Sequence, residues 1–159
     1  MVGEDVARPA AAAAEAAAKA IVAEEVLRYA RALIAAPSEN PGGTEDHVAE
    51  VVTGILTDLG ADIRIVRSEE GRPSVVARLG SGERPRLAWN GHLDTVPAGD
   101  PSTWSSGPFE GEVVDDRLVG RGACDMKGPI ASALAAVAAL RRAGLSLAGT
   151  LDLHLVADE

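Results

Sequence analysis

The most constraining feature of the sequence is the stretch 87–128, in which polar side chains follow an apolar run. His92 and Asp94 stand two residues apart at the end of that run. Asp125 follows a long loop rich in Gly, Pro and Ser and comes just before an apolar, Ala-rich segment, and Glu159 closes a second apolar run. Strands that end at one edge of a sheet bring the residues that follow them together. The pattern therefore predicts a metal site at a sheet edge.

Size and charge exclude several classes of protein. The chain has 159 residues, of which 47% are hydrophobic, enough for one domain with a core. Its net charge of -9 argues against a nucleic-acid partner, because binding phosphates requires clustered Lys and Arg. The single cysteine cannot form an internal disulfide. No segment resembles a secretory leader or the roughly 20 apolar residues of a membrane span, so we expect a cytoplasmic protein.

The first third of the sequence has helical spacing. Residues 1–19 are Ala-rich with few large side chains to bury, so we interpret them as an extension and place the domain at 20–159. Apolar side chains at helical spacing predict an amphipathic helix over 20–35. A second helix is expected after the next loop, with Thr44 as its N-cap and Gly60 as its left-handed stop.

After Gly60 the spacing of apolar residues changes to two, which indicates strands. A hairpin is expected to turn at Asp115 and Asp116. The predicted strands cover 63–65, 74–79, 86–91, 111–114, 117–119 and 150–156, and a buried crossover helix covers 129–143. This mixture of helices and strands predicts an α/β sandwich with a mixed sheet.

The spacing of His92 and Asp94 suits metal chemistry. Residues i and i+2 of an extended segment point the same way, so one side chain can bind a metal while the other fixes the geometry. A metal-binding His usually donates its second ring N–H to a carboxylate or a carbonyl. The spacing leaves open whether Asp94 serves His92 or a neighbouring group. Asp125 is also placed to cap the helix that follows it.

Two motifs carry a family resemblance. GHLDTVP, followed by Trp104, Pro108, Phe109 and then GRGACDMKG, resembles metallopeptidase family M20, the acetylornithine deacetylase and succinyl-diaminopimelate desuccinylase group. The likeness covers 20–159 in the same order. It implies the N-terminal part of a catalytic domain, an incomplete mixed-sheet α/β sandwich of the zinc-peptidase type.

The resemblance also implies roles for four residues. His92 corresponds to a ligand of one zinc ion and Asp125 to the carboxylate that bridges two. Asp94 corresponds to the residue that orients the site, and Glu159 to the general base. Ligation by His and carboxylate suits zinc, with cobalt or manganese open by the same geometry.

The implied reaction is hydrolysis of the amide bond of an N-acyl amino acid by a water that two metal ions activate. Two alternatives are a small-peptide metallopeptidase of the same family and a non-catalytic binding or regulatory member. The remaining ligands and the lid or dimerisation domain of the family have no counterpart before residue 159, so these residues alone are expected to be inactive. A homodimer stays open for the full-length protein.

Four other polar residues have simpler interpretations. Cys124 adjoins Asp125, but no base is placed beside it, so a small buried residue is expected rather than a nucleophile. Lys127 could contact substrate or solvent. His47 and His154 lie in a helix and a strand pattern and are interpreted as structural or exposed.

Overall fold

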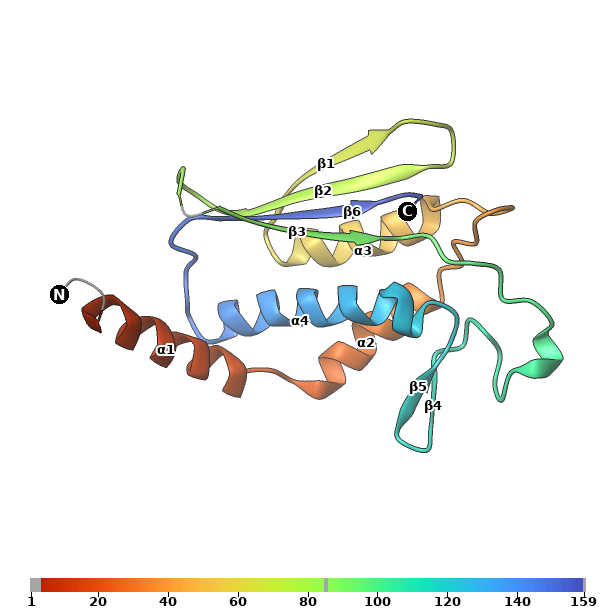
Figure 1. Ribbon diagram of the computed structural model, residues 1–159, viewed down its shortest axis with the longest axis horizontal. Helices are drawn as coiled ribbons and strands as arrows, with labels where there is room; N and C mark the ends of the chain where they lie inside the picture. Colours follow the sequence, from red (N-terminus) through yellow and green to blue (C-terminus); the bar gives the residue numbers. More distant parts are fainter. Residues whose placement is uncertain (1–3, 85, 159) are drawn as a thin grey trace.

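A four-stranded mixed sheet forms one layer of the protein, whose structure is a computed structural model describing residues 4–84 and 86–158 (Figure 1). The strand order is β1-β2-β6-β3, and β1/β2 and β2/β6 pair antiparallel while β3/β6 pair parallel. The sheet therefore confirms the predicted mixed α/β class. The strands are β1 (Asp62–Arg67), β2 (Pro73–Gly80), β3 (Arg86–His92) and β6 (Thr150–Val156).

Three helices cover one face of this sheet, as Figure 1 shows. They are α2 (Ala23–Ile34), α3 (Asp46–Asp58) and α4 (Gly128–Arg142). Because only 3% of residues are aromatic, aliphatic side chains fill the space between the layers. The fully buried members include Leu33, Val52, Leu56, Val75, Ile130, Leu134 and Leu153.

Helix α4 is the predicted crossover between β3 and β6. Parallel neighbours need such a connection, and here it also contains a long loop and a small hairpin of β4 (Glu112–Val114) and β5 (Arg117–Val119). The segment Ala123–Arg142 is long and apolar enough to cross a membrane by composition. Ile130 and Leu134 on it are nevertheless buried in the core, so α4 serves as a core helix.

The N-terminal residues form a helix of their own, α1 (Glu4–Lys19), which does not continue into α2. The predicted helix over 20–35 begins at Ala23 instead. Arg142, at the end of α4, donates to the carbonyl of Ala20 at 3.1 Å and pairs with Glu25 at 2.8 Å. The chain therefore changes direction between the two helices at a point tied to the core. The domain boundary at residue 19 stays a prediction.

The second predicted helix starts one residue later than expected. Glu45, rather than Thr44, occupies the N-cap position of α3, and no side chain caps the helix there. The Thr44 prediction was therefore wrong, because the Glu45 backbone N–H donates instead to the carbonyl of Gly71 at 3.0 Å. The left-handed stop at Gly60 is confirmed, with φ of 74°.

Candidate metal centre

The parallel pairing of β3 and β6 brings two strand ends to the same edge of the sheet. His92 is the last residue of β3 and lies opposite Val156, the last residue of β6. The ladder continues one step further, since the Leu93 N–H donates to the Val156 carbonyl at 2.8 Å. Asp94 therefore leaves the sheet beside Asp158. Glu159, the candidate general base, lies outside the described residues.

The His92 ring is held on both of its nitrogens. Its Nδ1 lies 3.0 Å from the backbone carbonyl of Asp94 and 3.3 Å from that residue's carboxylate. Its Nε2 lies 2.9 Å from Oδ1 of Asp125. If Nδ1–H donates to the carbonyl, Nε2 is the atom available to a metal. Asp94 thus faces His92 itself, through its carbonyl as well as its carboxylate.

Buried acceptors lie behind this ring. Oδ1 of Asp94 and Oε2 of Glu45 are buried and lack a hydrogen-bond partner among the described residues. Burial raises the pKa of Glu45, the neighbouring charge of Asp94 raises it further, and the Arg72 guanidinium opposes both effects. Sequence reasoning missed Glu45, because an acidic residue at a helix start is typical of an exposed first turn. No local signal distinguishes it from Asp46.

A strained turn presents Asp125. Gly122 is left-handed with φ of 82°, and its carbonyl accepts the Lys127 N–H at 2.8 Å. Asp125 has extended dihedrals inside the short π-helical turn Ala123–Lys127, so its side chain leaves the turn toward His92. The N-cap position of α4 falls at Lys127, which means that Asp125 does not cap that helix. Its carboxylate is 81% exposed, whereas the His92 side chain is 9% exposed.

Close packing under the site explains Gly91. A Cβ at this position would lie 2.9 Å from the Trp89 ring and 3.1 Å from the methyl group of Met126. The sulfur of Met126 in turn accepts the His92 backbone N–H at 3.3 Å. Gly91 therefore makes room for side chains that fix the turn before α4 against the end of β3.

Lys127 does not face solvent or an open surface where a substrate could bind. Its side chain is fully buried, and Nζ donates to the carbonyl of Ala36 at 2.7 Å. Burial lowers the pKa of Lys127 to about 8, against the opposing charge of Glu39. Lys127 thus ties the turn that bears Asp125 to the end of α2. The sequence could not identify this contact, which spans 91 residues.

The remaining polar candidates lie on the surface. Cys124 is exposed in the turn Ala123–Lys127, which corrects the expectation of a small buried residue. His154 is exposed on β6. His47 is exposed on α3 and lies 3.8 Å from Glu50. The structural or exposed interpretation of both histidines is confirmed.

The arrangement around His92 fits a divalent metal. No group of three or more His, Cys, Asp or Glu side chains converges within 4–84 and 86–158. The pair of His92 and Asp125 nevertheless brings an imidazole nitrogen within 2.9 Å of a carboxylate oxygen. Two donors about 2.0–2.1 Å from one tetrahedral zinc lie about 3.3 Å apart, so a small shift would admit the ion. Nitrogen and oxygen donors without thiolate are typical of hydrolytic zinc sites.

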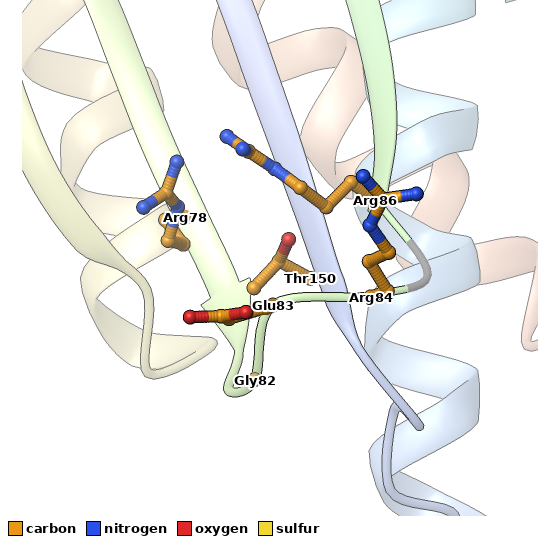
Figure 2. Close-up of a pocket in the computed structure, with 6 residues that line it drawn as sticks. All are labelled: Arg78, Gly82, Glu83, Arg84, Arg86 and Thr150. Carbon is orange, nitrogen blue, oxygen red and sulfur yellow. The ribbon is translucent and has the colours of Figure 1, made fainter.

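A pocket of about 900 Å³ lies at the opposite end of the sheet (Figure 2). Its lining includes Arg86 and Thr150, the first residues of β3 and β6, together with Arg78, Gly82, Glu83 and Arg84. Arg78 and Arg86 both reach Asp152, at 2.6 and 3.6 Å. This pocket holds no imidazole, so its size does not identify it as the metal centre.

In this mixed α/β domain, β3 ends at the His92 imidazole, and the turn before α4 brings the Asp125 carboxylate to it. The model of peptidase family M20/M25/M40 matches residues 88–159, which include His92, Asp94 and Asp125. The chain is therefore similar to this family over these residues.

Curated relatives support the assignment. The succinyl-diaminopimelate desuccinylase of Gluconacetobacter diazotrophicus is 43% identical over 136 residues, which are 84% of this chain and 34% of the relative. The enzyme of the same name from Rhodopseudomonas palustris is 40% identical over 140 residues, 85% of this chain and 35% of the relative. The chain thus spans about a third of the length of the curated relatives it matches.

Solved structures share the fold. An M20 family metallo-carboxypeptidase, Sso-CP2 from Sulfolobus solfataricus, aligns with a TM-score of 0.74 and 25% identity over 85% of this chain and 31% of that chain. Human carnosine dipeptidase 1 aligns with a TM-score of 0.73 and 26% identity over 84% of this chain and 31% of that chain.

Proposed function

We propose that the protein carrying this chain is a metal-dependent hydrolase that cleaves the amide bond of an N-acyl amino acid. The observation that carries the proposal is the convergence of His92 Nε2 and Asp125 Oδ1 at 2.9 Å, where β3 and β6 end together. An amide is a poor electrophile, so its hydrolysis requires polarisation of the carbonyl and a strong nucleophile. The Asp125 carboxylate is exposed at this sheet edge, so the substrate carbonyl and the nucleophile can both reach it.

Each residue has a distinct role in this proposal. His92 and Asp125 would hold zinc, and the Asp125 carboxylate is exposed enough for a metal to reach it. When bound, two zinc ions supply carbonyl polarisation and an activated water, and cobalt or manganese could replace them. Asp94 keeps the His92 ring oriented through Nδ1. Glu159 accepts the proton of the attacking water and delivers it to the departing amine.

The names of the relatives support the substrate class. Proteins 40–43% identical to this chain are succinyl-diaminopimelate desuccinylases, which suggests an N-succinyl or N-acetyl amino acid as the substrate. The net charge of -9 argues against a nucleic-acid partner. A cytoplasmic location stays a prediction, and a homodimer stays open for the full-length protein.

Peptide hydrolysis is the second candidate. It is favoured by the likeness to a carboxypeptidase and a dipeptidase, although at 25–26% identity rather than 40–43%. The two reactions share the metal and the general base and differ only in the group attached to the scissile carbonyl. A non-catalytic binding member would retain the fold without turnover.

Hydrolysis of a substrate panel tests these candidates. A protein of the relatives' length that carries this sequence is stripped of metal, then assayed with and without zinc on N-succinyl-diaminopimelate, N-acetylornithine and simple dipeptides. We expect zinc-dependent turnover, highest on an N-acyl amino acid. Preferred cleavage of dipeptides would instead establish the peptidase, and absence of turnover on all of them with zinc would support the non-catalytic alternative.

A further inference from the structure

A buried ion pair lies behind the candidate metal centre. Glu45 is fully buried, and its carboxylate is paired with the guanidinium of Arg72. The neighbouring residue forms a contrasting pair, since Asp46 and Arg67 lie 2.6 Å apart with side chains 44% and 56% exposed. A pair of this kind requires defined geometry, because the buried carboxylate has lost its water and depends on the guanidinium instead.

The Arg72 guanidinium also contacts a second segment. Its Nη2 donates to Oδ1 of Asn40 at 3.0 Å, and Nδ2 of Asn40 donates to Oδ1 of Asp158 at 2.5 Å. A guanidinium is planar and presents its donors in a fixed fork, so it holds two acceptors in a set relation. The contacts form a continuous chain from Glu45 to Asp158.

This series of hydrogen bonds is also connected to the end of β3. The Asn40 N–H donates to the Thr95 carbonyl at 2.7 Å, and the Thr95 N–H donates to the Ser38 carbonyl at 2.8 Å. The hydroxyl of Ser38 donates to the Leu93 carbonyl at 2.7 Å. The segment 38–40 therefore runs alongside 93–95, the residues that include Asp94.

The end of β6 needs such a contact. Beyond Val156 the strand leaves the ladder, and Asp158 adopts a left-handed conformation with φ of 65°. A side chain with a Cβ adopts that conformation at a cost unless its surroundings hold it there. Asn40 provides the side-chain contact at this residue, immediately before Glu159 in the sequence.

We propose that Arg72 and Asn40 are positioning residues that set the end of β6 at Asp158, the residue before the proposed general base, relative to His92 and Asp94. The proposal rests on the function proposed above for Glu159. Neither residue touches a proposed metal ligand, so their loss should slow the reaction without weakening zinc binding.

Two substitutions test the contact between Asn40 and Asp158 in the full-length hydrolase by exchanging the side chain that donates the hydrogen bond with the one that accepts it. Asn40→Asp keeps an acceptor for Arg72 but places a carboxylate against Asp158. We expect kcat to fall on the order of 10²-fold, as for a misplaced catalytic group, with KM and zinc affinity close to wild type. Adding Asp158→Asn restores a donor facing an acceptor and should recover most of kcat.

A conservative variant tests Arg72. Arg72→Lys keeps the charge beside Glu45, but an ammonium cannot bridge Glu45 and Asn40 as the fork does. We expect a loss of kcat similar to that of Asn40→Asp. The matched control is Arg67→Lys at the neighbouring exposed pair, which should leave kcat unchanged.

Amide hydrogen exchange separates this proposal from the proposed function. In both Asn40→Asp and Arg72→Lys, the amides of 157 and 158 should exchange faster while the core of β6 stays protected. Unchanged exchange at these amides, or failure of Asp158→Asn to restore it, would overturn the network even if the wild-type protein hydrolyses no substrate. Absence of zinc-dependent turnover in wild type with the expected exchange pattern would overturn the proposed function alone.

Discussion

The two ends of the β3/β6 ladder differ in how their charges are held. At the end where both strands begin, Arg78 and Arg86 surround Asp152 with side chains 51% and 62% exposed. At the end where both strands finish, the side chains of His92 and Asp94 are nearly buried and each has fixed contacts. The first end has a pocket of about 900 Å³, yet the second end holds the imidazole and carboxylate that can bind a metal.

Under the proposed function, the chemical site is the end of the ladder where the His92 ring is restrained, and not the end with the larger open volume. Water reaches the Arg78 and Arg86 side chains and screens their attraction to Asp152. The buried His92 ring lacks that freedom, because both of its nitrogens have fixed contacts. Substitutions where β3 and β6 end should therefore have large effects on activity and stability. Equivalent substitutions where the two strands begin should have small effects.

The largest effect is expected from His92→Ala in the full-length hydrolase. Loss of a metal ligand should reduce kcat/KM by roughly 10³-fold, because metal polarisation of the carbonyl supplies several kcal/mol of the barrier reduction. The matched control is His154→Ala, since His154 is exposed on the adjacent strand. Turnover and zinc content are measured together. If His92→Ala retained full activity, the assignment of the metal centre would be wrong.

The variants Gly122→Ala and Gly82→Ala compare how tightly the two ends of the β3/β6 ladder are packed. Both glycines have positive φ, 82° and 105°, so alanine is strained at either position. A Cβ at Gly122 would also lie 2.7 Å from the Thr95 methyl group, whereas a Cβ at Gly82 meets no described atom within 4 Å.

We expect Gly122→Ala to lower the free energy of unfolding by roughly 2–5 kcal/mol, the sum of about 1–2 for the left-handed alanine and about 1–3 for overpacking. Gly82→Ala should show only the first of these effects. Urea unfolding of the two variants measures the difference. Equal losses would mean that the turn bearing Asp125 is no more tightly packed than the open connection between β2 and β3.

Spacing and motifs predicted most of the fold and the two proposed ligands. The predicted strand 150–156 coincides with β6, and the crossover helix lies within one residue of its predicted limits. These features depend on local periodicity, which the sequence displays directly. His92 and Asp125 could be paired because each follows a local pattern that recurs in a known family.

The sequence did not show which charges are buried. Glu45 and Asp46 are adjacent acidic residues, but only Glu45 turns inward, toward an arginine 27 residues later in the chain. Lys127 was equally ambiguous, because its partner carbonyl belongs to Ala36. Such contacts depend on how separate elements pack, which single-residue patterns do not encode.

The smallest effect is expected from Arg78→Met, at the starting end of the strands. Hydrogen bonds from Arg78, with its charge and that of Arg86, hold the pKa of Asp152 below its ordinary value of 3.8. A carboxyl with a lowered pKa stabilises the fold above that ordinary value and loses this contribution as the pH falls through the lowered pKa.

Arg78→Met should therefore lower the thermal midpoint slightly at pH 7, with Arg86 retaining part of the interaction, and the difference from wild type should shrink toward zero in strong acid. Thermal unfolding of both proteins across this pH range measures the trend, and zinc-dependent activity at pH 7 should be unchanged. A loss of activity comparable with that of His92→Ala would contradict the contrast between the two ends, because it would mean that the exposed arginines also govern the chemistry.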